Sequence, residues 1–491
     1  MGLTHEIYRT SLGLLTDLYQ LTMAQGYWKL GRAEDEAVFH LLFREHPFAG
    51  GFTVAAGLAC VVDVLRELAF DAEDAAYLAT LQGNDGGRLF DPEFLKALQR
   101  IAWAWDIDAV PEGTVVFPHE PLVRVRGPLL QCQLLETPLL NLINFQTLVA
   151  TKAARVCMAA GDDAVLEFGL RRAQGIDGAL AASRAAFLGG CAATSNVLAG
   201  RLFGIPVKGT HAHSWVMSFD DEAEAFRAYA EAMPNNCVFL VDTYDTLEGV
   251  RRAIEAGKAL RQRGHELAGV RLDSGDLAYL SIQARQMLDE AGFADAAILA
   301  SNDLDEHIIA SLKDQGARIA VWGVGTRLVT AYDDPALGGV YKLAMIRHAG
   351  RDWEYKVKLS EQTAKISTPG CLQVRRFREN GRFVADMIHD TQRPVPESAV
   401  IVHPTDPTKR KAIPAHATGE DVLVPVFRGG ECVYNVPALT ESRKRTAEQL
   451  AGFHGGVKRF VNPHAYPAGL ERGLHDLKMR LILEARGLGE D

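Results

Sequence analysis

The stretch Ala268-Gly-Val-Arg-Leu-Asp-Ser-Gly-Asp276 decides the fold class, because a short apolar run ends abruptly in a polar loop. Six such runs occur between Val165 and Val324. Their loops are 167–172 (EFGLRR), 209–214 (GTHAHS), 242–246 (DTYDT), 271–276 (RLDSGD), 301–305 (SNDLD) and 323–326 (GVGT). The strands of a parallel (β/α) barrel all end at one mouth, where loops far apart in sequence surround a single ligand. We therefore expect the six loops to form one site.

Helical stretches separate the strand-like runs, at 222–233, 247–256, 277–291 and 306–315. The spacing, roughly 20 to 40 residues per unit, is typical of consecutive βα units. We therefore predict a (β/α) barrel catalytic domain over 151–345. The segment 1–150 is predicted to be an N-terminal α+β domain that opens with a helix at 10–30. The segment 346–491 is predicted to be a C-terminal segment that partly packs on the N-terminal domain.

The composition favours small-molecule chemistry in the cytoplasm. Hydrophobic residues make up 48% of the chain and charged residues 23%, as in folded globular domains. The net charge of −10 disfavours nucleic acid and membrane partners, which require a basic face. The seven cysteines are scattered without a C-x-x-C pair, which indicates a reduced compartment rather than a disulfide framework. The longest apolar stretch, 54–65, is too short to span a bilayer.

Basic residues gather in and around the strand-end loops although the chain is acidic. They are Arg171, Arg172, Arg184, Lys208, Arg271, Arg327 and Lys342. Arginine matches phosphate bidentately, and a Gly-rich turn such as 323–326 lets backbone N–H groups approach phosphate oxygens. Each residue alone is as well explained by a solvated surface or a tight turn, but the set indicates an anionic ligand. Neither a Walker loop nor a complete dinucleotide fingerprint occurs.

Four aspartates lie on two successive loops: Asp273, Asp276, Asp303 and Asp305. Carboxylates at a barrel mouth can bind ribose hydroxyls, hold a hydrated Mg²⁺, or stabilise positive charge at an anomeric carbon. A single loop aspartate is more often part of a turn or a helix cap. Both interpretations stay open for these four, and for Asp242 and Asp245.

His211 and His213 stand two residues apart after a strand-like run, so both would project to the same side. An H-x-H pair begins the metal site of some barrel hydrolases, but such a site needs further histidines on later strands. His265 and His307 do not fall at strand ends. The alternatives are a neutral imidazole that acts as a nucleophile, and plain hydrogen bonding.

Five pieces of the chain resemble the nicotinate phosphoribosyltransferases. They are Thr16-Asp-Leu-Tyr-Gln20, Phe43-Arg-Glu-His-Pro-Phe48, Glu167-Phe-Gly-Leu-Arg-Arg172, Gly209-Thr-His-Ala-His-Ser214 and Arg271-Leu-Asp-Ser-Gly-Asp276. The resemblance extends from Leu14 to the Asn462-Pro-His-Ala-Tyr466 region, nearly the whole chain. It implies an α/β fold in two parts: an irregular (β/α) barrel, and an α/β domain built from N-terminal and post-barrel segments.

The resemblance also implies the reaction and its partners. Nicotinate and 5-phosphoribosyl 1-pyrophosphate would give nicotinate mononucleotide and pyrophosphate in NAD biosynthesis, with ATP as a co-substrate and Mg²⁺ as a cofactor. The protein would be a homodimer with sites at the subunit interface. His213 matches the histidine that ATP phosphorylates, and His211 is not required by the motif.

Further roles follow from the same resemblance. Tyr19, expected from the partner subunit, and Phe168 match the residues that stack on the pyridine ring. Arg171 and Arg271 match arginines that contact phosphate and the pyridine substrate. Asp273 and Asp303 match the ribose and pyrophosphate side. The remaining expected substrate-binding residues are Thr194, Ser195, Thr210, Gly323, Gly325 and Thr326, of which the last three form the 5'-phosphate cradle.

Ser195 favours the acid over the amide as substrate. The related nicotinamide enzyme resembles this chain but has an acidic residue at that position, which would repel a carboxylate. The alternatives are a nicotinamide phosphoribosyltransferase, a barrel metallohydrolase that uses His211 and His213, and an inactive ligand-binding homologue.

Overall fold

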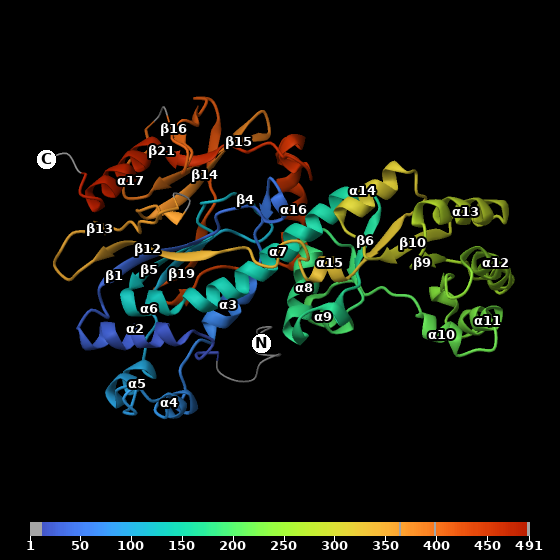
Figure 1. Ribbon diagram of the computed structural model, residues 1–491, viewed down its shortest axis with the longest axis horizontal. Helices are drawn as coiled ribbons and strands as arrows, with labels where there is room; N and C mark the ends of the chain where they lie inside the picture. Colours follow the sequence, from blue (N-terminus) through green and yellow to red (C-terminus); the bar gives the residue numbers. More distant parts are fainter. Residues whose placement is uncertain (1–11, 363–364, 397–398, 489–491) are drawn as a thin grey trace. The chain divides into compact units, whose positions relative to one another are not determined.

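The computed structural model describes residues 12–362, 365–396 and 399–488. The chain forms two compact units (Figure 1). The first unit combines Met1–Leu148 with Ala336–Asp491, and the second is Val149–Pro335. The boundary at 148 falls inside the long helix α7 (Glu136–Ala160). Within the described part of the chain, none of the helices combines the length and the apolar character that a membrane span requires.

The second unit is built on a six-stranded parallel sheet with the order β7-β6-β11-β10-β9-β8. The strands are β6 (Ala164–Glu167), β7 (Ala193–Thr194), β8 (Val238–Leu240), β9 (Gly269–Leu272), β10 (Ala297–Asn302) and β11 (Val321–Val324). Most of their residues are buried, including Phe239, Val270 and Trp322. Near-continuous apolar strands of this kind are typical of a parallel sheet that is covered on both faces.

Helices alternate with these strands: α8 (Gly175–Gly189), α9 (Val197–Phe203), α10 (His213–Met217), α11 (Glu222–Ala232), α12 (Thr246–Gln262), α13 (Leu277–Glu290), α14 (Glu306–Asp314) and α15 (Thr326–Val329). Short 3-10 turns lie at Leu170–Arg172 and Pro234–Asn236. The side chains of Asp221, Asp245, Asp276 and Asp305 accept hydrogen bonds from backbone N–H groups in the first turns of α11, α12, α13 and α14. Four helices therefore begin at an aspartate cap.

The predicted mixed α/β class is confirmed. The sheet pairing of the described residues is open, with β7 and β8 at its edges, and no closed barrel appears in it. The strand-like run that precedes the 209–214 loop, residues 205–208, forms only a single parallel bridge, between Thr194 and Val207, and residues 208–212 then have no regular secondary structure. Instead, β7 provides the strand beside β6.

The first unit contains a seven-stranded sheet with the order β13-β12-β1-β5-β3-β19-β20. The central strands come from the N-terminal segment: β1 (Glu36–Leu42), β5 (Val123–Pro128) and β3 (Asp106–Ala109). The outer strands come from the C-terminal segment: β12 (Val340–Arg347), β13 (Glu354–Tyr355), β19 (Val424–Arg428) and β20 (Glu431–Cys432). Antiparallel pairs β1–β12 and β3–β19 join the two segments.

The other N-terminal elements of this unit are mostly helices: α2 (Leu18–Lys29), α3 (Leu58–Arg66), α4 (Ala72–Leu78), α5 (Pro92–Leu98) and α6 (Leu129–Leu134). A 3-10 turn lies at Pro47–Ala49, and β2 (Thr53–Val54) pairs with β4 (Val115–Val116). The predicted opening helix is present as α2, and the part of that prediction at residues 10 and 11 lies outside the described residues.

A second sheet of the first unit, with the order β17-β16-β21-β15-β14-β18, is formed wholly by the C-terminal segment. Its strands are β14 (Leu372–Glu379), β15 (Arg382–Asp390), β16 (Val400–Val402), β17 (Arg410–Ala412), β18 (Thr418–Asp421) and β21 (Ala468–Glu471). Helices α16 (Leu439–Gly452) and α17 (Arg472–Ala485) and a 3-10 turn at Gly455–Lys458 complete the segment. Arg376 is buried here and pairs with the buried Asp386, so the charge of the guanidinium is compensated.

Candidate active site

The ends of three neighbouring strands bring the predicted polar loops together. Parallel pairing sets Leu240 of β8 opposite Arg271 of β9, and Arg271 opposite Leu299 of β10. The residues that follow therefore emerge at the same edge of the sheet, as the strand-end pattern predicts. In Figure 1, β6, β9 and β10 lie within one sheet of the second unit.

Arg271 is the centre of this cluster. Its Nε donates to Ser301 Oγ at 2.7 Å, its Nη1 to Thr210 Oγ1 at 3.0 Å, and its Nη2 to Asp273 Oδ1 at 2.8 Å. The guanidinium carbon lies 5.7 Å from the centre of the Phe168 ring. These three hydrogen bonds, to acceptors on β10, in the 209–214 loop and in the turn after β9, fix the plane of the guanidinium. Binding of a ligand therefore costs little further loss of side-chain freedom at Arg271.

Asp273 is held in its ionised form. Burial alone would raise the pKa of this carboxyl, but the Ser301 hydroxyl and Arg271 outweigh burial and lower it. The backbone N–H of Asp273 donates to Asp242 Oδ2 at 2.9 Å, and Ser274 Oγ donates to the same oxygen at 2.6 Å. Asp242 thus stabilises the turn that carries Asp273, which is the turn interpretation left open by the sequence.

His213 is the first residue of α10 and faces this cluster. Its Nδ1 lies 3.1 Å from Thr243 Oγ1, and its Nε2 lies 3.8 Å from Asp273 Oδ2. The imidazole is partly exposed, with 39% of the side chain accessible. A ring with Nδ1 held by a hydroxyl and Nε2 directed toward a carboxylate can act as a nucleophile through Nε2.

His211 has a different environment. Its Nε2 accepts the backbone N–H of Leu240 at 3.2 Å, and its Nδ1 donates to the Ala212 carbonyl at 3.3 Å. Burial lowers the pKa of His211, so the ring is neutral. With both nitrogens bonded to backbone, neither offers a lone pair to a metal. Among the described residues, no group of three or more His, Cys, Asp or Glu side chains gathers into a metal-binding cluster.

A second cluster lies at the ends of β6 and β7. The buried carboxylate of Glu167 accepts from Ser183 Oγ at 2.8 Å and from Thr194 Oγ1 at 2.6 Å, and it also accepts the Gly169 N–H. The Thr194 hydroxyl in turn accepts the N–H of Asn196 at 2.9 Å. Thr194 is fully buried, so its side chain stabilises the loop that presents Ser195, and a direct substrate contact by Thr194 stays a prediction.

Phe168 packs beside these residues because two glycines make room for it. A Cβ on Gly323 would lie 2.7 Å from Phe168 Cδ2, and one on Gly325 would lie 3.1 Å from the Phe168 carbonyl oxygen. Any side chain at Gly323 would therefore displace the ring. The structure gives Gly323 a packing reason in addition to the predicted role in a phosphate cradle.

The other predicted residues are placed with fewer contacts. Arg171 and Asp303 are exposed, and Thr326 is half-buried at the start of α15. Asp303 follows Asn302, which has a φ of 144°, a strained conformation of the kind that clusters at functional sites. Tyr19 lies in α2 of the first unit with 47% of its surface exposed, and its predicted ring stacking stays a prediction.

The carboxylates on the loops divide into two kinds. Asp276 and Asp305 are helix caps, as is Asp245. Asp305 is further engaged by Arg327. Asp273 and Asp303 lie between the strand ends and the caps, which leaves them as the carboxylates available to a ligand.

Sequence reasoning assigned no role to Ser301, Thr243 or Glu167, although all three lie in or next to the strand-end loops. It also missed a basic pocket in the first unit, lined among others by Arg44, His119, Lys342 and Lys365. Burial, with Lys478, His403 and Arg44 nearby, lowers the pKa of His119 to about 4. Lys342, which the sequence analysis grouped with the basic residues around the strand-end loops, lies instead in β12 of the first unit and lines this pocket.

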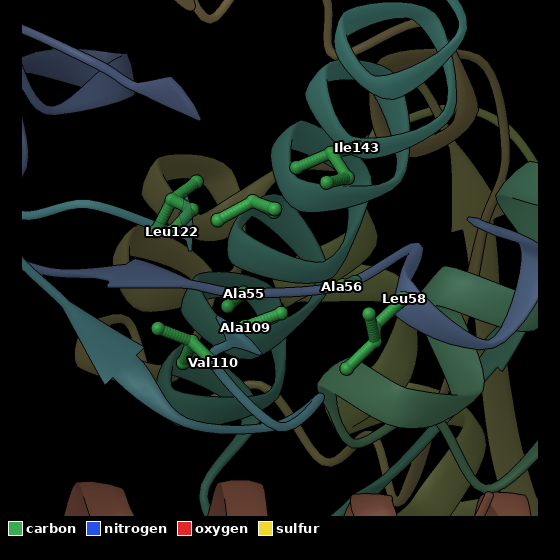
Figure 2. Close-up of a pocket in the computed structure, with 8 residues that line it drawn as sticks. Ala55, Ala56, Leu58, Ala109, Val110, Leu122 and Ile143 are labelled. Atoms are coloured by element: carbon green, nitrogen blue, oxygen red, sulfur yellow. The ribbon is translucent and has the colours of Figure 1, made fainter. Parts of the chain in front are cut away.

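A further hollow of the first unit has a different character (Figure 2). Its lining consists of the aliphatic side chains of Ala55, Ala56, Leu58, Ala109, Val110, Leu122, Val123 and Ile143. The cavity volume of about 10 Å³ barely admits a water molecule, so this hollow is a packing defect and not a substrate site.

Comparison with known proteins extends over nearly the whole chain. Three family models match the chain in succession. Residues 14–144 match the nicotinate phosphoribosyltransferase (NAPRTase) N-terminal domain, and residues 164–350 match the nicotinate phosphoribosyltransferase (NAPRTase) family. Residues 373–478 match the nicotinate phosphoribosyltransferase C-terminal domain. The nicotinate phosphoribosyltransferase of Bacillus subtilis is 43% identical over 98% of this chain and 97% of its own length. That of Dictyostelium discoideum is 39% identical over 96% of this chain and 88% of its own.

A solved structure is similar as well. The crystal structure of human nicotinic acid phosphoribosyltransferase superposes with a TM-score of 0.82 at 34% identity, over 95% of this chain and 99% of the human one. With these matches, the α/β fold and the strand-end site define a pentosyltransferase enzyme. The chain belongs to the nicotinate phosphoribosyltransferase family, and the predicted family is thereby confirmed.

Proposed function

We propose that this chain transfers the phosphoribosyl group of 5-phosphoribosyl 1-pyrophosphate to nicotinate in NAD biosynthesis. The bond from the ribose C1' to pyrophosphate breaks, and the pyridine nitrogen forms the new bond to C1'. The observation that carries the proposal is the joint placement of Arg271, Asp273 and His213 at one edge of the sheet in a chain of this family. The transition state resembles an oxocarbenium ion, so the ionised Asp273 stabilises the positive charge that develops on the ribose.

The pyridine ring is bound beside Phe168, with Ser195 near the substrate carboxylate and Arg171 and Arg271 as the cationic partners. Tyr19 of the partner subunit completes the slot in a homodimer. On the other side of the ribose, Asp303 contacts hydroxyl or pyrophosphate oxygens. The 5'-phosphate is bound by Gly323, Gly325 and Thr326. Thr194 and Thr210 act by holding Glu167 and Arg271 in place.

ATP is coupled to the transfer through His213 in this proposal. A proton on Nδ1, donated to Thr243 Oγ1, leaves the lone pair on Nε2. Nε2 attacks the γ-phosphorus of ATP while the bond to ADP breaks. The phosphoryl group adds negative charge and acceptor oxygens near Asp273 and Arg271, and the change in the affinity for substrates is thermodynamically linked to phosphorylation.

Mg²⁺ is proposed to enter with the pyrophosphate group. The described residues provide no cluster of metal-binding side chains, and Mg²⁺ commonly keeps waters and substrate phosphates as ligands. No protein ligand is assigned to it.

Two further parts of the proposal concern the surroundings of the site. The parallel sheet of the second unit is proposed to act as the wall of an irregular barrel, with its free edges at β7 and β8. The scattered cysteines support a cytoplasmic location.

The test is an assay for nicotinate mononucleotide from nicotinate and phosphoribosyl pyrophosphate, with and without ATP. We expect product with nicotinate, more of it when ATP is present, and a preference over nicotinamide. The Ser195→Asp variant should lose activity with nicotinate, because a carboxylate at this position repels the substrate carboxylate. A wild-type preference for nicotinamide would identify the alternative enzyme, and stoichiometric tightly bound zinc would support the hydrolase alternative.

A further inference from the structure

Ser301 lies between the two charged groups of the site. It is part of β10, only 4% of the residue is exposed, and its Oγ accepts the Nε–H of Arg271 at 2.7 Å. The same hydroxyl donates its proton to Asp273 Oδ1. A hydroxyl has one proton to donate and lone pairs to accept, so both capacities of Ser301 are used within the site.

The hydrogen bonds of Ser301 are linked to a second hydroxyl. Thr210 Oγ1 accepts from Arg271 Nη1 and donates to the His211 carbonyl at 3.0 Å. The direct contact between Arg271 Nη2 and Asp273 closes a ring of three groups with Ser301. Arg271 lies in β9 and Asp273 directly follows it, whereas Ser301 comes from the neighbouring strand β10, so the relative position of the ion pair is set across the sheet.

We propose that Ser301 is a positioning residue for the phosphoribosyl transfer, which orients Arg271 and Asp273 toward phosphoribosyl pyrophosphate. The inference rests on the proposed function and deepens it. Without the hydroxyl, Arg271 Nε would lose its acceptor and Asp273 would lose a donor to its charged oxygen. Hydrogen bonds to charged groups in a partly buried site are the strong class.

The charge state of Asp273 gives this role a specific signature. The groups that face Asp273 are Arg271 near the end of β9, His213 on α10, and Asp242 after β8, whose carboxylate accepts the Asp273 N–H. Arg271 favours the ionised carboxyl and Asp242 disfavours it. Burial raises the pKa of Asp273, and the hydrogen bond from the Ser301 hydroxyl, together with Arg271 and His213, lowers it. Removal of the hydroxyl should therefore raise that pKa.

The experiment compares Ser301→Ala with Ser281→Ala in the full-length protein. Ser281 is a matched control, because it is a fully buried serine of α13 whose Oγ donates to the Ala278 carbonyl and accepts the Arg318 N–H. For Ser301→Ala we expect KM for phosphoribosyl pyrophosphate to rise about ten-fold. We also expect the acidic limb of the kcat/KM profile to move to higher pH, because that limb reports free-enzyme ionisation. Ser281→Ala should leave both unchanged.

The proposal is overturned if Ser301→Ala loses activity equally at every pH with an unmoved acidic limb, because a merely structural serine would do this. Should Ser301→Ala fail to fold, Ser301→Cys keeps the approximate volume with a much weaker donor, and the same two readouts apply to it. Failure of the proposed function is distinguished by the wild type. A wild-type protein that forms no nicotinate mononucleotide contradicts the function itself, whereas an active wild type with unshifted variants contradicts only the role of Ser301.

Discussion

At the scale of single residues, the two histidines of one motif show how local contacts separate roles. His211 is bonded to backbone through both ring nitrogens and is neutral because of burial. His213, two residues later, begins a helix and directs its Nε2 to the side of Asp273. The first histidine therefore fixes the loop, and the second is placed to react.

For the His213→Ala variant we expect loss of ATP-derived labelling of the protein, because the proposed phosphoryl acceptor is absent. Part of the ATP-independent transfer should remain, since Arg271 and Asp273 keep their mutual contacts. The measurement is incorporation of label from γ-labelled ATP beside the rate of product formation without ATP. Acid-labile labelling that persists in the variant would show that another residue is the phosphoryl acceptor, with His211 the next candidate.

At the scale of elements, aspartates have two roles on neighbouring loops: some cap a helix, and others are available to a ligand. Asp276 and Asp305 satisfy N–H groups at the starts of α13 and α14, whereas Asp273 and Asp303 occupy the turn before each helix. A strand-turn-helix unit thus offers one carboxylate position that supports the fold and one that can meet a ligand.

The variants Asp276→Ala and Asp303→Ala distinguish the capping role from the ligand-binding role. Asp276→Ala removes the hydrogen bond to the Tyr279 N–H and should cost about 1 kcal/mol of stability, with activity at 25 °C retained. Asp303→Ala should lower kcat/KM and leave the melting temperature nearly unchanged, because Asp303 is exposed and caps no helix. Thermal unfolding measures the change in stability, and steady-state kinetics measure the change in kcat/KM. A loss of kcat/KM in Asp276→Ala together with a loss of stability in Asp303→Ala would contradict the division of roles.

Element positions could be predicted well where local chemistry is strong. The predicted helices at 222–233 and 306–315 are α11 and α14 to within a residue or two, because an aspartate cap and a 3.6-residue apolar period mark them. β7 was not predicted, since two residues carry no periodicity. The 205–208 run has the composition of a strand but makes only one bridge.

The site could be predicted only as far as residue types in loops allow. Asp273, Arg271 and His213 do lie together in the structure. Ser301 was missed because its importance depends on the register between β9 and β10, which one sequence does not specify. That register sets Arg271 opposite Leu299, two residues before Ser301, so that the Arg271 side chain reaches the Ser301 hydroxyl. The role of His211 was left open for a similar reason, since its partner, the Leu240 N–H, is 29 residues away.

At the scale of the whole molecule, buried neutral histidines link stability to pH. Burial lowers the pKa of His46 to about 3. The same cause, with Arg124 nearby, lowers that of His40 to about 3. The ordinary value is 6.5, so between these limits the unfolded chain binds a proton that the folded chain excludes. The contribution of these two histidines to the stability of the folded state is therefore complete above about pH 6.5 and is lost as the pH falls toward 3.

We therefore expect the free energy of unfolding to fall on acidification by up to about 1.4 kcal/mol per pH unit for each such histidine. The His46→Asn variant cannot titrate, and its amide can retain the 2.9 Å contact that His46 Nδ1 makes with Thr53 Oγ1. The free energy of unfolding, measured by denaturant unfolding at a series of pH values, should fall less steeply with decreasing pH below 6.5 for this variant than for the wild type. Identical slopes for variant and wild type would contradict the assignment.

The seven-stranded sheet of the first unit, which combines N-terminal and C-terminal strands, also determines when this unit can fold during synthesis. β1, β5 and β3 leave the ribosome first, but their outer neighbours β12 and β19 follow only after the whole second unit has been made. Val149–Pro335 is contiguous and has all its strands by residue 335. The N-terminal strands must therefore wait for the last third of the polypeptide, and a chain cut at residue 335 contains a complete second unit but not a complete first one.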